Sequence, residues 1–187
     1  DISSATIGTI ADQSYTGSAI TPDLEVKDGT ATLTQGKDYT VSCTDIYVGS
    51  ATLTITGKGN YTGEKKGVNF NIVAADQNPT FTTPKDLVMG GHMLDLRDLV
   101  SNAQGEMTFT IASGTAATLS GYTLTSTAAI TGEVKINVSI AAKDVDGDHV
   151  NEYNAYSKSD AITVNVVDKS PSNYTTEPTA KTDLKYD

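Results

Sequence analysis

The stretch ATLTITGKGNYTG, Ala51–Gly63, decides the fold of this chain. Apolar Ala51, Leu53 and Ile55 alternate with threonine, and a turn-forming run, Gly57–Asn60, follows. Because a β-strand repeats every two residues, this alternation buries one face and leaves the other in water. Glycine and asparagine tolerate the positive φ of tight turns. The stretch therefore predicts a half-buried strand and a turn, which is typical of an antiparallel sheet.

The same alternation recurs along the rest of the chain. It predicts strands over Val68–Ile72, Val134–Ile140 and Ile162–Val166, with turns at Asp28–Gly29, Gly90–Gly91, Ser120–Gly121 and Asp146–Gly147. The side chains expected to be buried are Leu53, Ile55, Phe70, Ile136, Val138 and Val164. Many short strands separated by turns favour an all-β sandwich architecture. Only Leu94–Val100 leaves a choice, since its pattern fits a helical turn or a strand equally well.

The first part of the chain carries a recognisable order of segments. These are Asp12–Gly17 (DQSYTG), Ile20–Pro22 (ITP), Gly36–Val41 (GKDYTV) and the stretch Ala51–Gly63. In this order they resemble the bacterial immunoglobulin-like (Big-type) domains of cell-surface and secreted proteins. The resemblance implies an immunoglobulin-like β-sandwich with an extracellular or cell-surface location. It also implies that Tyr15, Tyr39 and Tyr61 are structural tyrosines.

A second unit follows and resembles a different subgroup of the same domains. The resemblance is carried by Asn78–Phe81, by Gly90–Gly91 before Leu94–Leu96, by Thr108–Ile111 and by a final strand, Ile162–Val166. We therefore expect an all-β chain of two tandem immunoglobulin-like β-sandwich domains, residues 1–74 and 75–168. Residues 74–79 form a short linker in this prediction, and the proline-broken residues 169–187 a polar C-terminal tail or linker.

Composition excludes several classes of partner. The chain has 187 residues, 37% of them hydrophobic, no tryptophan and a net charge of −10. Nucleic-acid binding needs clustered Lys and Arg, and Arg97 is the single arginine, so no nucleic-acid partner is expected. An anionic membrane surface is disfavoured for the same reason. No segment approaches the roughly 20 apolar residues of a spanning helix, so no membrane insertion is expected.

The acidic segment Asp144–Glu152 (DVDGDHVNE) is the sharpest local motif. Carboxylates at alternate positions around a glycine can converge on Ca²⁺, which makes Asp144, Asp146 and Asp148 candidate ligands. The glycine comes one residue earlier than in helix-flanked calcium loops, and Glu152 is too near in sequence to act as their distal bidentate ligand. The alternative is a hairpin tip kept soluble by its charge. The sequence thus predicts no cofactor, with Ca²⁺ binding by this loop as the alternative.

Other chemistry finds no support. Cys43 is the only cysteine and is expected to be a buried structural thiol. His92 and His149 are the only histidines, and neither has a second ligand at the spacing of a zinc site. No Gly-x-Ser-x-Gly elbow is present, and no phosphate-binding glycine loop precedes a helix. The prediction is that the chain is not an enzyme.

Three functions remain open. One is a non-catalytic structural or spacer segment of a surface or secreted protein, in contact with neighbouring domains of a longer chain. A second is an adhesin-type module that recognises glycan or host protein through Tyr153 and Tyr156 in the long loop Asp144–Asp160. An accessory domain of a polysaccharide-active enzyme is a third. An exposed aromatic patch would favour binding, whereas tyrosines folded back onto the sheet would favour the spacer.

Overall fold

The computed structural model describes residues 1–168, and the predicted tail at 169–187 lies outside them. The described chain is all-β, with strands in sandwich-like sheets and two short 3-10 turns, which confirms the predicted fold class. Among these residues no helix has the length and apolarity to span a bilayer.

The chain divides into two compact units that are not simply consecutive in sequence. Among the described residues, the first contains 1–79 together with 102–107 and 139–157, and the second contains 80–101, 108–138 and 158–168. The segment 139–157 follows the strand at Gly132–Ile140, yet it groups with the first unit. The predicted boundary at 74/75 ignores this return of the chain, and the tandem arrangement stays a prediction.

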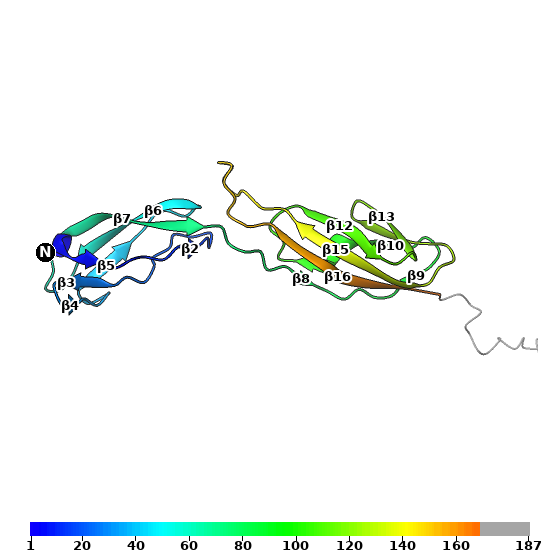
Figure 1. Cartoon of the computed structure of the whole chain (residues 1–187), viewed down its shortest axis with the longest axis horizontal. Coiled ribbons are helices and arrows are strands. Elements are labelled where there is room, and N and C mark those ends of the chain that lie inside the picture. Colours follow the sequence, from blue (N-terminus) through cyan, green and yellow to red (C-terminus); the bar gives the residue numbers. More distant parts are fainter. Residues whose placement is uncertain (169–187) are drawn as a thin grey trace, which may run out of the picture. The chain divides into compact units, whose positions relative to one another are not determined.

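The first unit contains two sheets (Figure 1). One has the order β1-β3-β4 and the other the order β2-β7-β6-β5, in which β2 runs parallel to β7 and the other pairs are antiparallel. The elements are η1 (Ile2–Ser4), β1 (Thr6–Ile7), β2 (Gln13–Ser14), β3 (Val26–Asp28), β4 (Ala31–Thr32), β5 (Tyr39–Ser42), β6 (Gly49–Gly57) and β7 (Glu64–Val73).

Side chains from both sheets of the first unit meet in its core. Val26 of β3 packs in one buried cluster with Tyr39 of β5 and Ile55 of β6. The register of β6 and β7 shifts between Leu53 and Ile55, where β7 carries an extra residue beside Gly67. Gly67 has φ 72°, so glycine suits this bulge because side chains disfavour that conformation. In β7 the bulge separates the charged residues 64–66 from the later part of the strand, in which Phe70 and Ile72 are buried.

The second group of strands also forms sheets around a buried stripe. The sheet orders are β10-β14-β13, β11-β8 and β12-β15-β16-β9, with β9 parallel to β16. The elements are β8 (Thr80–Phe81), β9 (Leu87–Val88), β10 (Met93–Asp95), η2 (Leu96–Leu99), β11 (Val100–Ser101), β12 (Met107–Ser113), β13 (Ala117–Ser120), β14 (Thr123–Ser126), β15 (Gly132–Ile140) and β16 (Tyr156–Val167).

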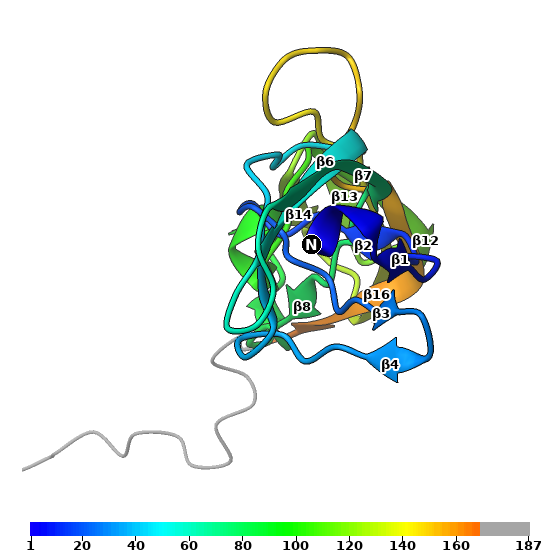
Figure 2. The same cartoon turned by 90° about the vertical axis from the view of Figure 1, so that its left-hand side faces the viewer.

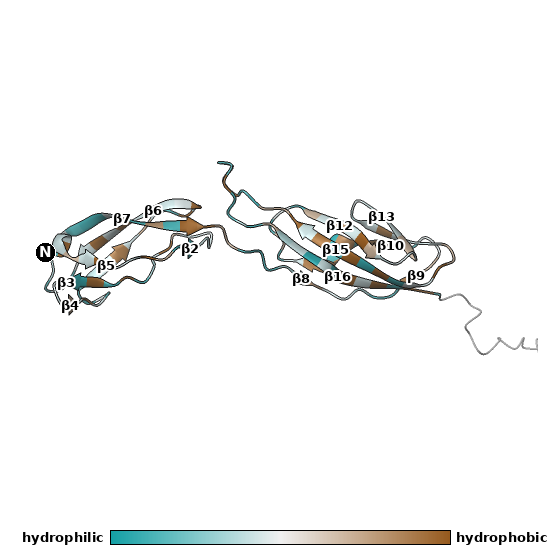
Figure 3. Ribbon diagram, viewed as in Figure 1, coloured by the Kyte–Doolittle hydropathy of each residue, from teal (hydrophilic) through white to brown (hydrophobic). Residues whose placement is uncertain are grey.

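The predicted inward-facing side chains are all buried. Along β15 the side chains at alternate positions from Val134 to Ile140 are at most 1% exposed. Along β16 the side chains at alternate positions from Ile162 to Val166 are at most 3% exposed. Figure 3 shows apolar residues recurring along both strands. The buried set includes Leu53, Ile55, Phe70, Ile136, Val138 and Val164, as the alternation predicted.

Two local predictions are refined. The segment Leu94–Val100 contains both alternatives, since β10 ends at Asp95 and η2 begins at Leu96. The Asp95 carboxylate accepts from the Arg97 backbone N–H at 2.9 Å and pairs with its guanidinium at 2.6 Å, which lowers the pKa of Asp95. Cys43 is half-buried rather than buried, because β5 ends at Ser42 and the thiol lies just beyond the strand.

We expect truncation on the inward face of β15 to destabilise the protein and truncation on its outward face to have little effect. Ile136→Ala removes a fully buried side chain and should lower the free energy of unfolding by about 2–5 kcal/mol. Ser139→Ala, at an exposed position of the same strand, should stay within about 0.5 kcal/mol of the parent. Urea denaturation followed by circular dichroism measures both. Equal effects of the two substitutions would contradict the assigned faces.

Candidate functional site

The acidic motif lies in the loop between β15 and β16, drawn in gold in Figure 2. The loop is closed at its base by an antiparallel bridge between Lys143 and Tyr153. The Lys143 N–H donates to the Tyr153 carbonyl at 3.0 Å, and the N–H groups of Glu152 and Tyr153 donate to the Lys143 carbonyl at 2.8 and 3.1 Å. The eight residues between Lys143 and Glu152 thus form a closed turn.

Carboxylates organise the turn by accepting from its backbone. Asp144 accepts from the N–H groups of Gly147 and His149 at 2.6 and 2.9 Å. Asp146 accepts from the N–H of Asp148 at 3.2 Å, and Asp148 accepts from that of Val150 at 2.7 Å. Such local bonds from Asp side chains are what allow an irregular loop to satisfy its own amides.

Three carboxylates converge within this loop. One oxygen each from Asp144, Asp146 and Glu152 lies within 4.8 Å of the others, and no other group of three or more potential metal ligands occurs among residues 1–168. The structure therefore brings together two of the predicted residues, Asp144 and Asp146. It places Glu152 in the cluster, where the sequence had favoured Asp148. The reach of Glu152 was misjudged because the spacing rule assumed a helix-flanked loop, whereas here a bridge folds the chain back.

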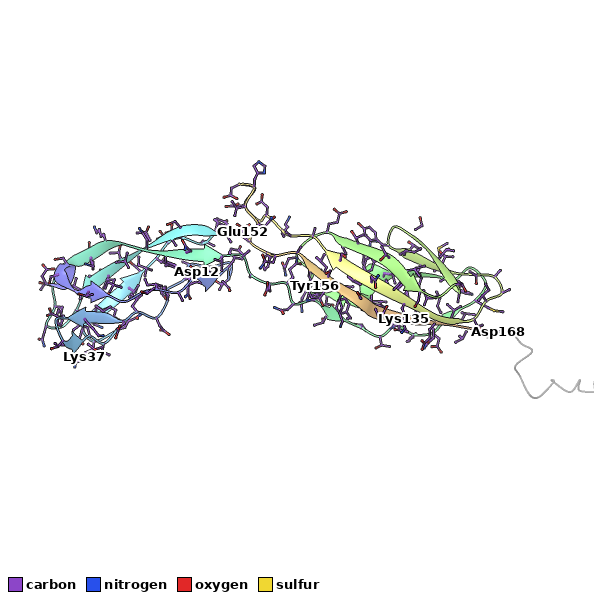
Figure 4. All side chains as sticks on the ribbon, viewed as in Figure 1. Asp12, Lys37, Lys135, Glu152, Tyr156 and Asp168 are labelled. Atoms are coloured by element: carbon purple, nitrogen blue, oxygen red, sulfur yellow. The ribbon has the colours of Figure 1, made fainter. Side chains whose placement is uncertain are left out.

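Glu152, labelled in Figure 4, is 0% exposed. Its Oε2 accepts from the backbone N–H of Val145 at 2.7 Å. Its Oε1 is buried and accepts no hydrogen bond from any described residue. Burying a carboxylate oxygen without a hydrogen-bond partner costs free energy. Oε1 is therefore an acceptor that the described residues leave without a donor.

The pKa values of the other two carboxylates shift in opposite directions. The backbone N–H of Gly147 is the main cause that lowers the pKa of Asp144, and the N–H of His149 adds to it. The pKa of Asp146 is raised, first by desolvation and then by the negative charges of Asp148, Glu152 and Asp144, against the opposing hydrogen bond from Asp148. Asp146 thus lies where negative charge accumulates.

The tyrosine candidates behave differently from each other. Tyr153 packs edge-to-face on Tyr15, with ring centroids 5.4 Å apart and an interplanar angle of 88°. Tyr15 is 8% exposed and stacks on its other side with Tyr47 at 6.4 Å. Burial, followed by the nearby charges of Tyr153 and Glu152, raises the pKa of Tyr15. Tyr156 is half-buried at the start of β16. Tyr153 is therefore folded back onto the first unit's aromatic core.

The predicted linker 74–79 is hydrogen-bonded to the end of the same loop. The Ala75 N–H donates to the Glu152 carbonyl at 2.8 Å, and the Asn154 N–H donates to the Ala75 carbonyl at 2.9 Å. The Asn154 amide also donates to the Asp76 carboxylate at 2.8 Å. Residues 74–76 thus pair with residues 152–154 in the manner of a short parallel strand.

Gln77, which sequence reasoning missed, connects this pairing to two further segments. It is 4% exposed. Its Nε2 donates to the carbonyls of Ala141 and Asn154 at 2.8 and 2.7 Å, and its Oε1 accepts from the N–H groups of Gln104 and Gly105 at 2.8 and 3.3 Å. The only signal in the sequence was a polar side chain two residues before Pro79, which does not distinguish Gln77 from an exposed linker residue.

The remaining candidates stay apart from the acidic loop's cluster. His92 follows the Gly90–Gly91 turn, and its backbone N–H donates to the Ser126 hydroxyl. His149 lies in the loop with φ 75° but is not a member of the carboxylate group. The Cys43 thiol contacts the Asp45 carbonyl at 3.8 Å.

Removing the Gln77 amide should destabilise the first unit. Gln77→Ala removes four part-buried hydrogen bonds and leaves two carbonyls and two N–H groups without this partner, so we expect a loss of about 2–4 kcal/mol in the free energy of unfolding. The matched control is Gln104→Ala, whose side chain is exposed, with an expected change within about 0.5 kcal/mol. Chemical denaturation measures both. A neutral Gln77→Ala would refute the role assigned to this amide.

The substitution Gln77→Glu should make stability depend on pH. The new carboxylate would face the carbonyl oxygens of Ala141 and Asn154, which disfavours its charged form, so its pKa in the folded state is raised. A raised folded-state pKa means that the folded chain retains the proton longer than the unfolded chain. Stability relative to the parent should therefore fall as pH rises above about 4.3, the usual pKa of glutamate. Thermal midpoints at pH 4 and pH 7 test the sign, and an increase with pH would contradict it.

Comparison with known proteins adds no assignment. No protein-family model matches the chain, and the search of curated proteins found no match. The resemblance to bacterial immunoglobulin-like domains therefore stays a prediction drawn from the residues that carry it.

Proposed function

We propose that this chain is a non-catalytic structural or spacer segment of a bacterial cell-surface or secreted protein. The observation that carries the proposal is the packing of Tyr153 on Tyr15. A tyrosine that reads a glycan or a host protein needs an accessible ring, whereas this ring contributes to the core of its own unit. The sequence alternatives differed on this feature, and a tyrosine folded back onto the sheet favours the spacer.

The hydrogen bonding around residues 74–77 supports the same proposal. A spacer acts through stiffness, and a stiff connection needs its backbone groups bonded to the fold rather than to water. Ala75 is paired through both its N–H and its carbonyl, and the Gln77 side chain makes four bonds to backbone groups. The proposed partners are the neighbouring domains of a longer chain.

We expect the pairing of residues 74–76 with 152–154 to protect its amides from hydrogen exchange. The N–H groups of Ala75 and Asn154 should exchange about 100-fold more slowly than that of Asn151 at the exposed loop tip. Exchange measured residue by residue with NMR supplies the comparison. If Ala75 and Asn154 exchange as fast as Asn151, the connection is a flexible tether and the spacer proposal fails.

The adhesin alternative keeps one observation in its favour. Tyr47, Val145 and Val150 are apolar and more than two-fifths exposed in the first unit. A glycan and extracellular-matrix array with the whole chain tests it. We expect no specific binding to the array, either by the parent chain or by the Tyr153→Ala and Tyr156→Ala variants. A specific signal that is lost in either variant would establish an adhesive module in place of a spacer.

A further inference from the structure

The strongest unexplained group in the described chain is the Glu152 carboxylate. It is wholly buried, and one of its two oxygens has no donor. The side chains that approach it are the carboxylates of Asp144 and Asp146, which carry the same charge. A buried charge among like charges is stable only if a cation or a proton joins it. The fold therefore gathers three acidic side chains where it would be expected to separate them.

No side chain of the described residues completes the environment of Glu152 Oε1, which has no hydrogen-bond partner. The positive charges of His149 and Lys143 act on Asp144, whose pKa they help to lower, and neither side chain bonds to Oε1. Four backbone N–H groups of the loop already donate to carboxylate oxygens other than Oε1; they belong to Val145, Gly147, His149 and Val150. Hence neither a basic side chain nor a spare loop amide completes the environment of Oε1.

The donor set identifies the kind of cation. All three ligands are carboxylate oxygens, which suit hard cations such as Ca²⁺ and Mg²⁺ better than zinc, which favours His and Cys. Opposite ligands of Ca²⁺ lie about 4.6–5.2 Å apart, and those of Mg²⁺ about 4.0–4.2 Å. Oxygens that all lie within 4.8 Å of one another can share one Ca²⁺ shell. Mg²⁺ demands a near-ideal octahedron, which an irregular turn does not readily supply. Ca²⁺ also accepts the irregular geometry that a turn provides.

We propose that Asp144, Asp146 and Glu152 form a calcium site, and that the bound ion stiffens the 144–152 loop of the first unit. The first two ligands come from the start of the loop and the third from its end, so one ion would close the loop across its base. Through its backbone Glu152 also holds Ala75, and its neighbour Tyr153 packs on Tyr15. This inference is independent of the spacer proposal, since a binding module would use the same site.

Direct calcium binding tests the proposal. The whole chain is stripped with EDTA, dialysed and titrated with CaCl₂ in a calorimeter. We expect one ion per chain, with a dissociation constant at or below about 1 mM, the range of extracellular calcium modules. MgCl₂ should bind at least about tenfold more weakly. Absence of calcium binding at about 10 mM would overturn the proposal.

Conservative variants assign the ligands. Glu152→Gln keeps an oxygen for the Val145 N–H, and Asp146→Asn keeps one for the Asp148 N–H, so both should fold. Each should weaken calcium binding by about tenfold or more, because each removes one ligand charge. The matched control is Asp148→Asn, which makes the same change outside the cluster and should stay within about threefold of the parent. Wild-type affinity in Glu152→Gln would overturn the site, as would a selective loss in Asp148→Asn.

A second measurement locates the ion without relying on affinity. The chain has no tryptophan, and Tyr15 and Tyr153 lie beside the cluster. Tb³⁺ placed at the site should therefore give tyrosine-sensitised emission that CaCl₂ displaces. Tyr153→Phe should reduce this emission and leave calcium affinity within about threefold, since the ring is not a ligand. Tyr61→Phe is the control distant from the cluster and should leave the emission unchanged. Emission insensitive to Tyr153→Phe would place the ion elsewhere.

Discussion

The described structure depends on the burial of alternate apolar side chains along a few long strands. Aromatic residues make up 6% of this chain, so its interior is filled mainly by Leu, Ile and Val from β6, β7, β15 and β16. Each strand has one buried and one wet face, and a slip of one residue would exchange them. The bulge at Gly67 shifts the register of β7 against β6 between the charged start of β7 and the later residues whose alternate side chains are buried. The apolar stripe therefore specifies the register, because a one-residue slip would expose the apolar side chains to water.

Two buried polar side chains bond to backbone groups of the 141–155 loop, and they differ in how their polar atoms are satisfied. Gln77 makes four hydrogen bonds to backbone groups of three other segments. Glu152 makes one side-chain bond and leaves its second oxygen without a donor. A neutral amide offers donors and an acceptor together, so it can join segments by itself. A carboxylate only accepts, which is why the same loop requires a cation where Glu152 enters it.

The local interactions of the acidic loop were partly accessible from sequence. Aspartates at alternate positions around Gly147 predicted carboxylates turned toward one another, and Asp144 and Asp146 do converge. Glu152 was set aside on spacing alone, because its position depends on the bridge between Lys143 and Tyr153. Tyr153 was similarly predicted to be an exposed ligand-binding residue of the loop. Its ring instead packs on Tyr15, which lies 138 positions earlier in the chain. Pairings over such distances leave no periodic trace in the sequence.

The sequence by itself determined the all-β class, the main strands and their inward faces, because a two-residue period is a local property of each segment. It also determined the lack of basic clusters and of catalytic motifs. Only the tertiary structure decided that residues 139–157 belong with the first unit, that Gln77 is buried, and that Glu152 completes a carboxylate cluster. The first two features arise from hydrogen bonds between distant segments, such as Gln77 and Ala141, and the third from the Lys143–Tyr153 bridge that folds the loop back on itself. Contacts of that range are chosen by the whole fold rather than by any one stretch of residues.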